Sequence, residues 1–142
     1  SPVPGVVDLY LLTPEGLPSA ALVAVTAAYV SGKKVRPLTD TVHVYPARRV
    51  VRNLRAELTL YEGADADAVR AAAVSALDAW REDKRLRLGV DVVRTQIIAL
   101  LSVYGVYSVS LLEPADDYEA AGSEWVDWRD VDIAIAPERK HG

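Results

Sequence analysis

The segment from Val51 to Lys84 constrains the fold most strongly, because two different periodicities follow one another in it. Residues 51–61 alternate between apolar and polar side chains, as a half-buried strand does. Residues 65–84 repeat their apolar side chains at helical spacing, and Asp65 or Asp67 is a candidate N-cap. The chain must therefore place a strand against an amphipathic helix. The apolar positions are Leu54, Ala56, Leu58 and Leu60 in the strand and Val69, Ala73, Ala76, Leu77 and Trp80 in the helix.

A shorter pattern of the same kind precedes this segment. Residues 7–13 predict a strand, residues 20–30 a helix capped by Ser19 and ended by Gly32, and residues 41–47 a second strand. The helix is apolar nearly all round, so it needs cover on more than one side. We expect this cover to come from a sheet and a neighbouring chain, or from further chain of the same protein.

Three more elements are expected after the long helix. Asp91 is a candidate cap for a helix over residues 92–104, with Gly105 as its terminator. Residues 106–112 predict a strand, and the alternation over residues 130–135 predicts the last strand. The side chains that this third helix should turn inward are Val93, Ile97, Leu100, Leu101 and Tyr104.

The order of these elements predicts an α+β fold of two consecutive small modules. Residues 1–49 would form β-α-β, and residues 50–142 would form β-α-α-β-β. A Glu-Gly pair follows a strand at Glu15 and again at Glu62, which indicates either an internal duplication or a chance similarity. Methionine is absent even at position 1, so we expect Ser1 to be a cut end and chain preceding it to complete the first module.

Composition excludes several classes of function. Of the 142 residues, 51% are hydrophobic and 25% are charged, which is typical of a globular domain. Cysteine is absent, so neither disulfides nor thiolate chemistry is available. A net charge of −4 argues against nucleic acid as a partner, and no apolar run reaches the roughly 18 residues of a membrane span.

The residues that usually carry catalysis are scarce. There are two histidines: His43 is on the polar face of a strand, and His141 is next to the end of the chain. No phosphate-binding, nucleophile-elbow or zinc-protease motif occurs, so we predict no catalytic residue, no cofactor and no metal site. The acidic residues between Glu113 and Glu124 could hold calcium, but a solvated loop is the favoured interpretation because the spacing is not that of an EF-hand.

Apolar, aromatic and arginine side chains outside the predicted core are candidates for contacts with other proteins. Trp125 and Trp128 are expected to flank the last strand, where they would either close the core or contact another subunit. An arginine stripe from Arg48 to Arg55 would either pair with carboxylates across an interface or belong to a solvated linker. The candidate interface residues are Leu22, Val25, Tyr29, Arg48, Arg52, Tyr104, Tyr107, Trp125 and Trp128.

Several stretches together resemble the baseplate J-like family, the wedge proteins of contractile tails in Mu-like phages and related prophages. The most specific are Gly5–Ser19 and Val35–Ala47. The stretches Glu57–Asp65, Leu88–Ile98 and Gly105–Ala115 are similar to the C-terminal part of that family. The chain departs from the family pattern in being rich in tyrosine and tryptophan near its end.

The resemblance implies a structural protein without catalysis, located in the tail baseplate of the virion and assembled in the cytoplasm of the bacterial host. Its implied partners are other baseplate wedge and hub proteins and copies of itself. Two alternatives remain open. A ferredoxin-like regulatory module would present a pocket with convergent polar groups, and an enzyme fragment would use the acidic loop with a divalent ion.

Overall fold

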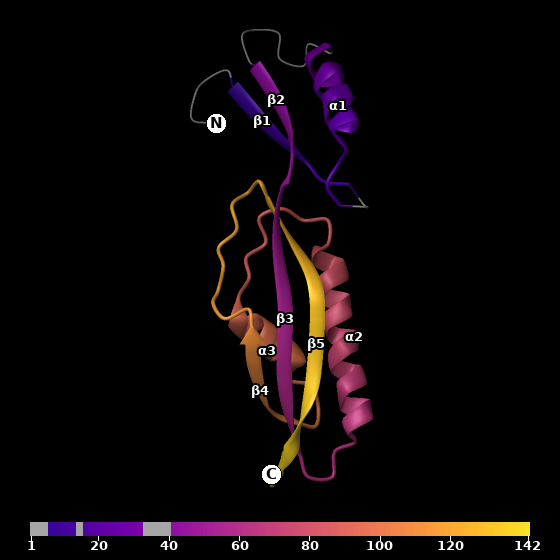
Figure 1. The fold of residues 1–142 in the computed structure, drawn as a ribbon, viewed down its shortest axis with the longest axis vertical. Coiled ribbons are helices and arrows are strands. Elements are labelled where there is room, and N and C mark those ends of the chain that lie inside the picture. The colour runs from indigo at the N-terminus through magenta and orange to yellow at the C-terminus, as the bar shows by residue number, and fades with distance from the viewer. Residues whose placement is uncertain (1–5, 14–15, 33–40) are drawn as a thin grey trace.

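The computed structural model describes residues 6–13, 16–32 and 41–142, and gives no account of the side chains of residues 6, 7, 29–32, 41 and 42. Helices and strands are mixed within this range, which confirms the α+β prediction. Two groups of elements lie one beyond the other along an elongated molecule (Figure 1). We call residues 6–46 the N-terminal unit and residues 48–140 the C-terminal unit.

The N-terminal unit contains β1 (Val6–Leu11), α1 (Ala20–Gly32) and β2 (Thr41–Pro46). The two strands pair in parallel, from Val6 opposite Thr41 to Leu11 opposite Pro46. Parallel strands need a crossover, and α1 provides it while lying beside the strand pair (Figure 1). The Ser19 hydroxyl accepts from the amide of Leu22 at 3.1 Å, so its predicted role as N-cap is confirmed.

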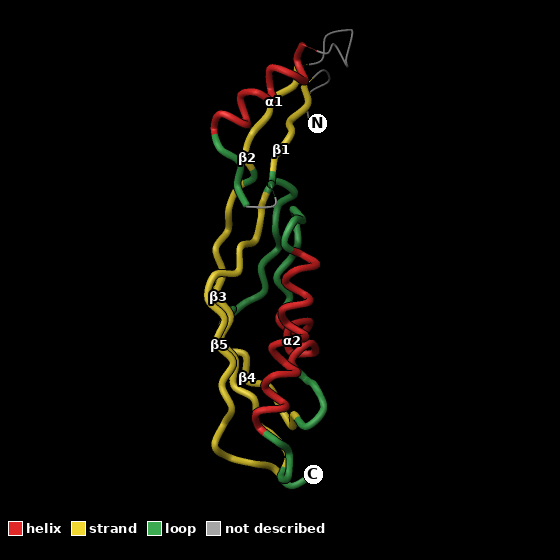
Figure 2. The backbone as a smooth tube through the Cα atoms, turned by 90° about the vertical axis from the view of Figure 1, so that its right-hand side faces the viewer, coloured by secondary structure: helices red, strands yellow, loops and turns green. Residues whose placement is uncertain are grey.

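The C-terminal unit contains β3 (Arg48–Tyr61), α2 (Ala66–Lys84), α3 (Arg94–Leu101), β4 (Val106–Glu113) and β5 (Glu124–Lys140). The predicted order β-α-α-β-β is confirmed. Strand β3 is central: β4 runs antiparallel to it and β5 runs parallel to it. Both helices lie on the same face of this sheet (Figure 2). The internal duplication stays a prediction.

The core of the C-terminal unit is the apolar face of β3 packed against α2 and α3. The predicted strand face is buried, with Leu58 and Leu60 fully inaccessible. Asp65 is the N-cap of α2, since its carboxylate accepts from the amides of Asp67 and Ala68 at 3.1 and 3.4 Å. The other buried members are Leu54 and Ala56 of β3, Val69, Ala73 and Leu77 of α2, Val92, Ile97 and Leu101 around α3, Leu111 of β4 and Ile133 of β5.

The predicted helix over residues 92–104 is wrong in its ends and its cap. Helix α3 spans eight residues, because Val92 pairs in an extended bridge with Tyr118. Asp91 accepts instead from the amide of Ala120 at 2.9 Å. The first amide of α3, that of Arg94, donates to the Asp117 carboxylate at 2.8 Å, so the cap comes from the acidic loop.

Two residues at the other end of α3 also differ from expectation. Tyr104 lies in the turn beyond the helix and is 100% exposed, not inward. Gly105 does not end the helix, which stops at Leu101. A methyl group built on Gly105 would lie 2.8 Å from Cγ2 of Val69, so a glycine is required for this turn to approach α2.

The tryptophans and arginines of the candidate interface also lie within strands. Trp125 and Trp128 belong to β5, which begins at Glu124, so the prediction that they flank the last strand is wrong. The arginine stripe belongs to β3, which overturns the linker interpretation. Arg49 donates to the Asp127 carboxylate of β5 at 2.7 Å. On the other side, Arg55 lies 3.6 Å from the Glu113 carboxylate of β4.

Candidate protein-contact surfaces

Helix α1 presents an apolar surface that the described chain leaves open. It carries no charged side chain. None of its described side chains, residues 20–28, is buried; Val25 is 66% exposed and Leu22 is 42% exposed. Of the candidate contact residues, Leu22 and Val25 therefore lie on the open surface of α1, while the side chain of Tyr29 lies outside the described residues.

Exposure of this kind is unusual for a helix of this composition. A contiguous apolar surface on a folded domain typically marks a contact with another protein. Beneath α1, strand β2 contributes Val44, which is 9% exposed, so the helix covers the small sheet with one side only. We interpret the opposite side of α1 as the strongest candidate contact surface in the described chain.

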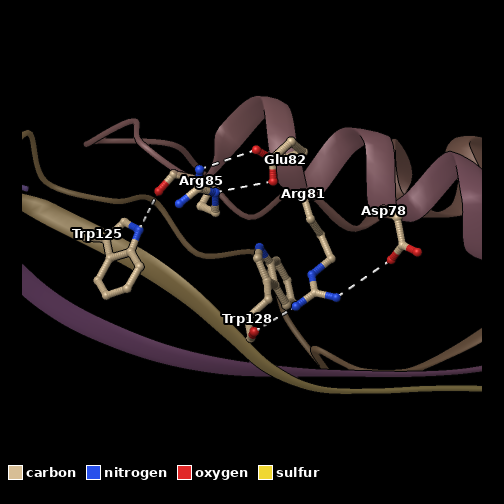
Figure 3. A network of polar contacts seen from close by, with 6 residues as sticks. All are labelled: Asp78, Arg81, Glu82, Arg85, Trp125 and Trp128. Atoms are coloured by element: carbon tan, nitrogen blue, oxygen red, sulfur yellow. Dashed lines mark hydrogen bonds and ion pairs between the residues drawn. The ribbon is translucent and has the colours of Figure 1, made fainter. Parts of the chain in front are cut away.

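A cleft of about 460 Å³ lies where the turn after β1 meets the end of α2 and the start of β5. The indole of Trp125 donates to the carbonyl of Arg85 at 3.0 Å (Figure 3). Nearby, Arg81 of α2 donates to the carbonyl of Trp128 at 3.1 Å. The lining residues are Thr13, Gly16, Asp78, Arg81, Glu82, Lys84, Arg85, Trp125, Val126, Asp127 and Trp128.

Four of the charged side chains that line this cleft form ion pairs with one another. Arg81 lies 3.8 Å from Asp78, and Arg85 lies 3.2 Å from Glu82 (Figure 3). Both are pairs within α2, at the i,i+3 spacing that places side chains on one face. A small-molecule site usually has polar groups that converge on a ligand. The geometry of the cleft does not favour the regulatory-module alternative.

The two tryptophans at the cleft have different surroundings. Trp128 packs against Trp80 of α2 with ring centroids 5.7 Å apart, and it joins the edge of the core. Trp125 is outside that cluster and lies against Gly16 of the N-terminal unit instead. Trp128 therefore lies where the core-closing role was expected, while Trp125 lies between the two units.

An aromatic cluster lies at the far end of the C-terminal unit. Tyr104 is fully exposed and Tyr107 is 48% exposed. Tyr61, at the end of β3, meets Tyr107 edge to face with ring centroids 5.5 Å apart. The sequence analysis did not include Tyr61 among the candidate contact residues. Its position between the strand and the Glu-Gly turn could have indicated that it lies at this end of the unit. Tyrosine contributes a large, rigid contact area, so this end is a second candidate surface.

Arg52 and the acidic loop form a closed network. The Arg52 guanidinium lies 4.5 Å from the centre of the Tyr118 ring, and Tyr118 donates to the Glu124 carboxylate at 2.8 Å. The Ala121 amide donates to the same carboxylate at 2.8 Å. Arg48, at the start of β3, is exposed and adds a nearby positive charge.

These contacts shift two pKa values. The hydrogen bond from the Ala121 amide, supported by the one from Tyr118, holds the pKa of the Glu124 carboxyl below its usual range. The hydrogen bond to Glu124, together with desolvation, raises the pKa of Tyr118. Within the described residues no three His, Asp or Glu side chains are grouped to bind a metal. The carboxylates of Asp117 and Glu124 instead hold the loop in place.

The comparisons with known proteins cover both units. The Baseplate J-like central domain matches residues 1–46, and the Baseplate J-like protein C-terminal domain matches residues 52–134. The chain belongs to the baseplate J-like family. Baseplate protein J of Escherichia phage P2 is 39% identical over 119 residues, which are 82% of this chain and 39% of that protein. The chain thus spans about two fifths of the length of this relative.

Membership of the baseplate J-like family confirms the resemblance described above. Both matched regions contain candidate contact residues: Leu22 and Val25 lie in the first, and Tyr104, Tyr107, Trp125 and Trp128 lie in the second. No helix in the described part of this family member is long and apolar enough to cross a bilayer.

Proposed function

We propose that this chain is part of a structural protein of a phage tail baseplate and acts by contacts with other proteins. The observation that carries the proposal is the open surface of α1, an uncharged helix with no buried described side chain. Family membership supports a phage baseplate as the setting, and we extend the proposal to the baseplate of a prophage-derived injection machine. In this proposal the chain performs no catalysis, and it is assembled with the rest of the baseplate in the cytoplasm of the bacterial host.

We further propose that the chain has two domains, residues 1–49 and 50–142. In the first, Val44 and Ala47 are the buried hydrophobic residues of the described part, a small core for a sheet of two parallel strands. Parallel sheets are normally covered on both faces. The first domain is therefore completed by another polypeptide surface, and the partners are other baseplate wedge and hub proteins and copies of itself.

The test introduces a charge into the open face of α1 in the full-length protein. Leu22→Glu and Val25→Glu each place a carboxylate where an apolar contact would form, and burying it unpaired is costly. We expect both variants to be lost from purified tail particles, as measured by quantitative immunoblotting. Ser75→Glu, on the exposed side of α2, is the matched control and should be incorporated normally.

Circular dichroism of the isolated variants separates a contact defect from a folding defect. Variants that fold and still enter particles at wild-type levels would contradict the proposal that α1 contacts another protein. If Val25→Glu unfolds, Val25→Ser, which only weakens an apolar contact, is used in its place and is expected to reduce incorporation partially.

A further inference from the structure

The two units are linked covalently by one residue, since β2 ends at Pro46 and β3 begins at Arg48. Ala47 between them is buried, and its amide donates to the carbonyl of Leu11 at 2.8 Å. The next amide, that of Arg48, donates to the carbonyl of Ser123 at 2.9 Å. Such a link can rotate about its backbone dihedrals, so a second contact is needed to fix the direction of the N-terminal unit.

The turn after β1 makes this second contact. The amides of Thr13 and Gly16 each donate to the carbonyl of the other residue, at 2.7 and 2.8 Å. The Thr13 hydroxyl also donates to the Gly16 carbonyl at 3.0 Å, so both ends of the turn are held together. Gly16 is buried and has a φ of 112°, a conformation that favours glycine.

Trp125 of β5 is the residue that Gly16 faces. A methyl group built on Gly16 would lie 3.6 Å from Cζ3 of the indole, an ordinary contact, and 3.2 Å from Cη2, so the ring would have to move by a few tenths of an ångström. The absence of a side chain at Gly16 therefore lets the turn rest on the ring. This contact joins residues more than 100 positions apart in the sequence.

The indole is itself held on its other edge. Its Nε1 donates to the carbonyl of Arg85, the C-cap residue of α2, at 3.0 Å (Figure 3). Its backbone is fixed by the pairing of β5 with β3, where Trp125 lies opposite Arg49. Trp125 thus joins three segments: its ring meets the turn of the N-terminal unit and the end of α2, and its backbone belongs to the start of the central sheet.

We propose that Trp125 is the positioning residue that fixes the direction of the N-terminal unit relative to the C-terminal unit, with Gly16 as its counterpart. The Ala47 link and the Trp125 contact hold the N-terminal unit at two separate points, which suppresses rotation about either one. The chain then acts as a stiff rod, and a displacement of whatever binds α1 is carried to β3 and α2. This proposal does not depend on which proteins the chain contacts.

The chain is well suited to a direct test because it has no cysteine. Ala24→Cys on α1 and Ser75→Cys on α2 introduce two exposed labelling positions, one in each unit. Electron–electron resonance between spin labels then reports the distribution of distances between the units. We expect a narrow distribution in the parent protein and a broad one in Trp125→Ala and in Gly16→Ala. Trp125→Phe, which keeps a ring but loses the donor to Arg85, should be intermediate.

A second measurement addresses the contact itself. Hydrogen exchange of the Gly16 and Ala47 amides should accelerate about tenfold in Trp125→Ala, because local opening becomes easier. Tyr104→Ala, which removes an exposed aromatic side chain at the other end of the molecule, is the control and should change neither readout.

Unchanged distance widths in a folded Trp125→Ala would overturn the proposal. If that variant unfolds, Trp125→Phe and Gly16→Ala decide the question, since the first loses the hydrogen bond to Arg85 and the second places a methyl group against the ring. Parental widths in both would likewise overturn it.

Discussion

Helices α1 and α2 each follow a strand, but they differ in how much of their apolar surface the chain buries. Helix α2 buries one stripe, Val69, Ala73 and Leu77, and exposes a polar surface. Helix α1 is uncharged and buries none of its described side chains. The apolar side chains of α2 form one stripe, and this stripe packs against a single face of the sheet. The chain itself therefore buries the apolar surface of α2. In α1 the apolar residues surround the helix, and one small sheet covers only part of them.

Arginine side chains of the helices donate to carbonyls of both outer strands of the C-terminal unit. Strand β5 is an edge strand, and Arg70 of α2 donates to its Ile133 carbonyl at 2.9 Å. Arg94 of α3 donates to the Leu111 carbonyl of β4, the other edge, at 3.1 Å, and also to the Pro114 carbonyl. Covered edges resist pairing with other chains. Among the described residues, no side chain donates in this way to β1 or β2.

The largest expected difference between the two units is in stability. Leu77→Ala empties a fully buried position, so the free energy of unfolding should fall by about 2–5 kcal/mol. Leu22→Ala, on the open face of α1, should cost about 1 kcal/mol or less in the isolated chain. Urea denaturation monitored by circular dichroism measures both. Equal losses would show that α1 is already part of a closed core.

A smaller effect is expected from the edge arginines. Arg70→Ala removes the donor to the Ile133 carbonyl, and the free energy of unfolding should fall by about 1 kcal/mol. Sedimentation velocity should also show increased association, because the β5 edge becomes available for pairing. Arg87→Ala removes only an exposed pair with Asp83, 3.5 Å away, so it serves as the control. If the Arg70→Ala protein stays monomeric at every concentration, Arg70 does not prevent the β5 edge from pairing with other chains.

The smallest effect concerns the acidic loop. The pKa of Glu124 is lower in the folded chain than in the unfolded one, so its contribution to stability is present above the unfolded pKa, near pH 4. That contribution is lost as the pH falls through the folded pKa. Glu124→Gln should therefore lower the urea midpoint at pH 7, and the gap to the parent protein should shrink in acid. A gap that is constant with pH would assign the effect to packing instead of charge.

Local periodicity predicted much of the C-terminal unit. The alternation over residues 51–61 identified the buried face of β3, and helical spacing identified the buried stripe of α2. Of two candidate caps, Asp65 was the correct one, because Asp67 is already inside the helix. These features depend on neighbours within a few residues, which the sequence displays directly.

The tertiary structure decided which distant segments of the chain come into contact. The bridge of Val92 with Tyr118 shortened α3, and Asp117 replaced Asp91 at its N-terminus. The parallel pairing of β3 with β5 placed Trp125 against Gly16, and no local pattern marks either residue as a joint. The sequence by itself determined the order of the strands and helices and the buried faces of β3 and α2. Only the folded chain determined which of these meet, because strand pairing between residues 76 to 79 positions apart depends on topology and not on spacing.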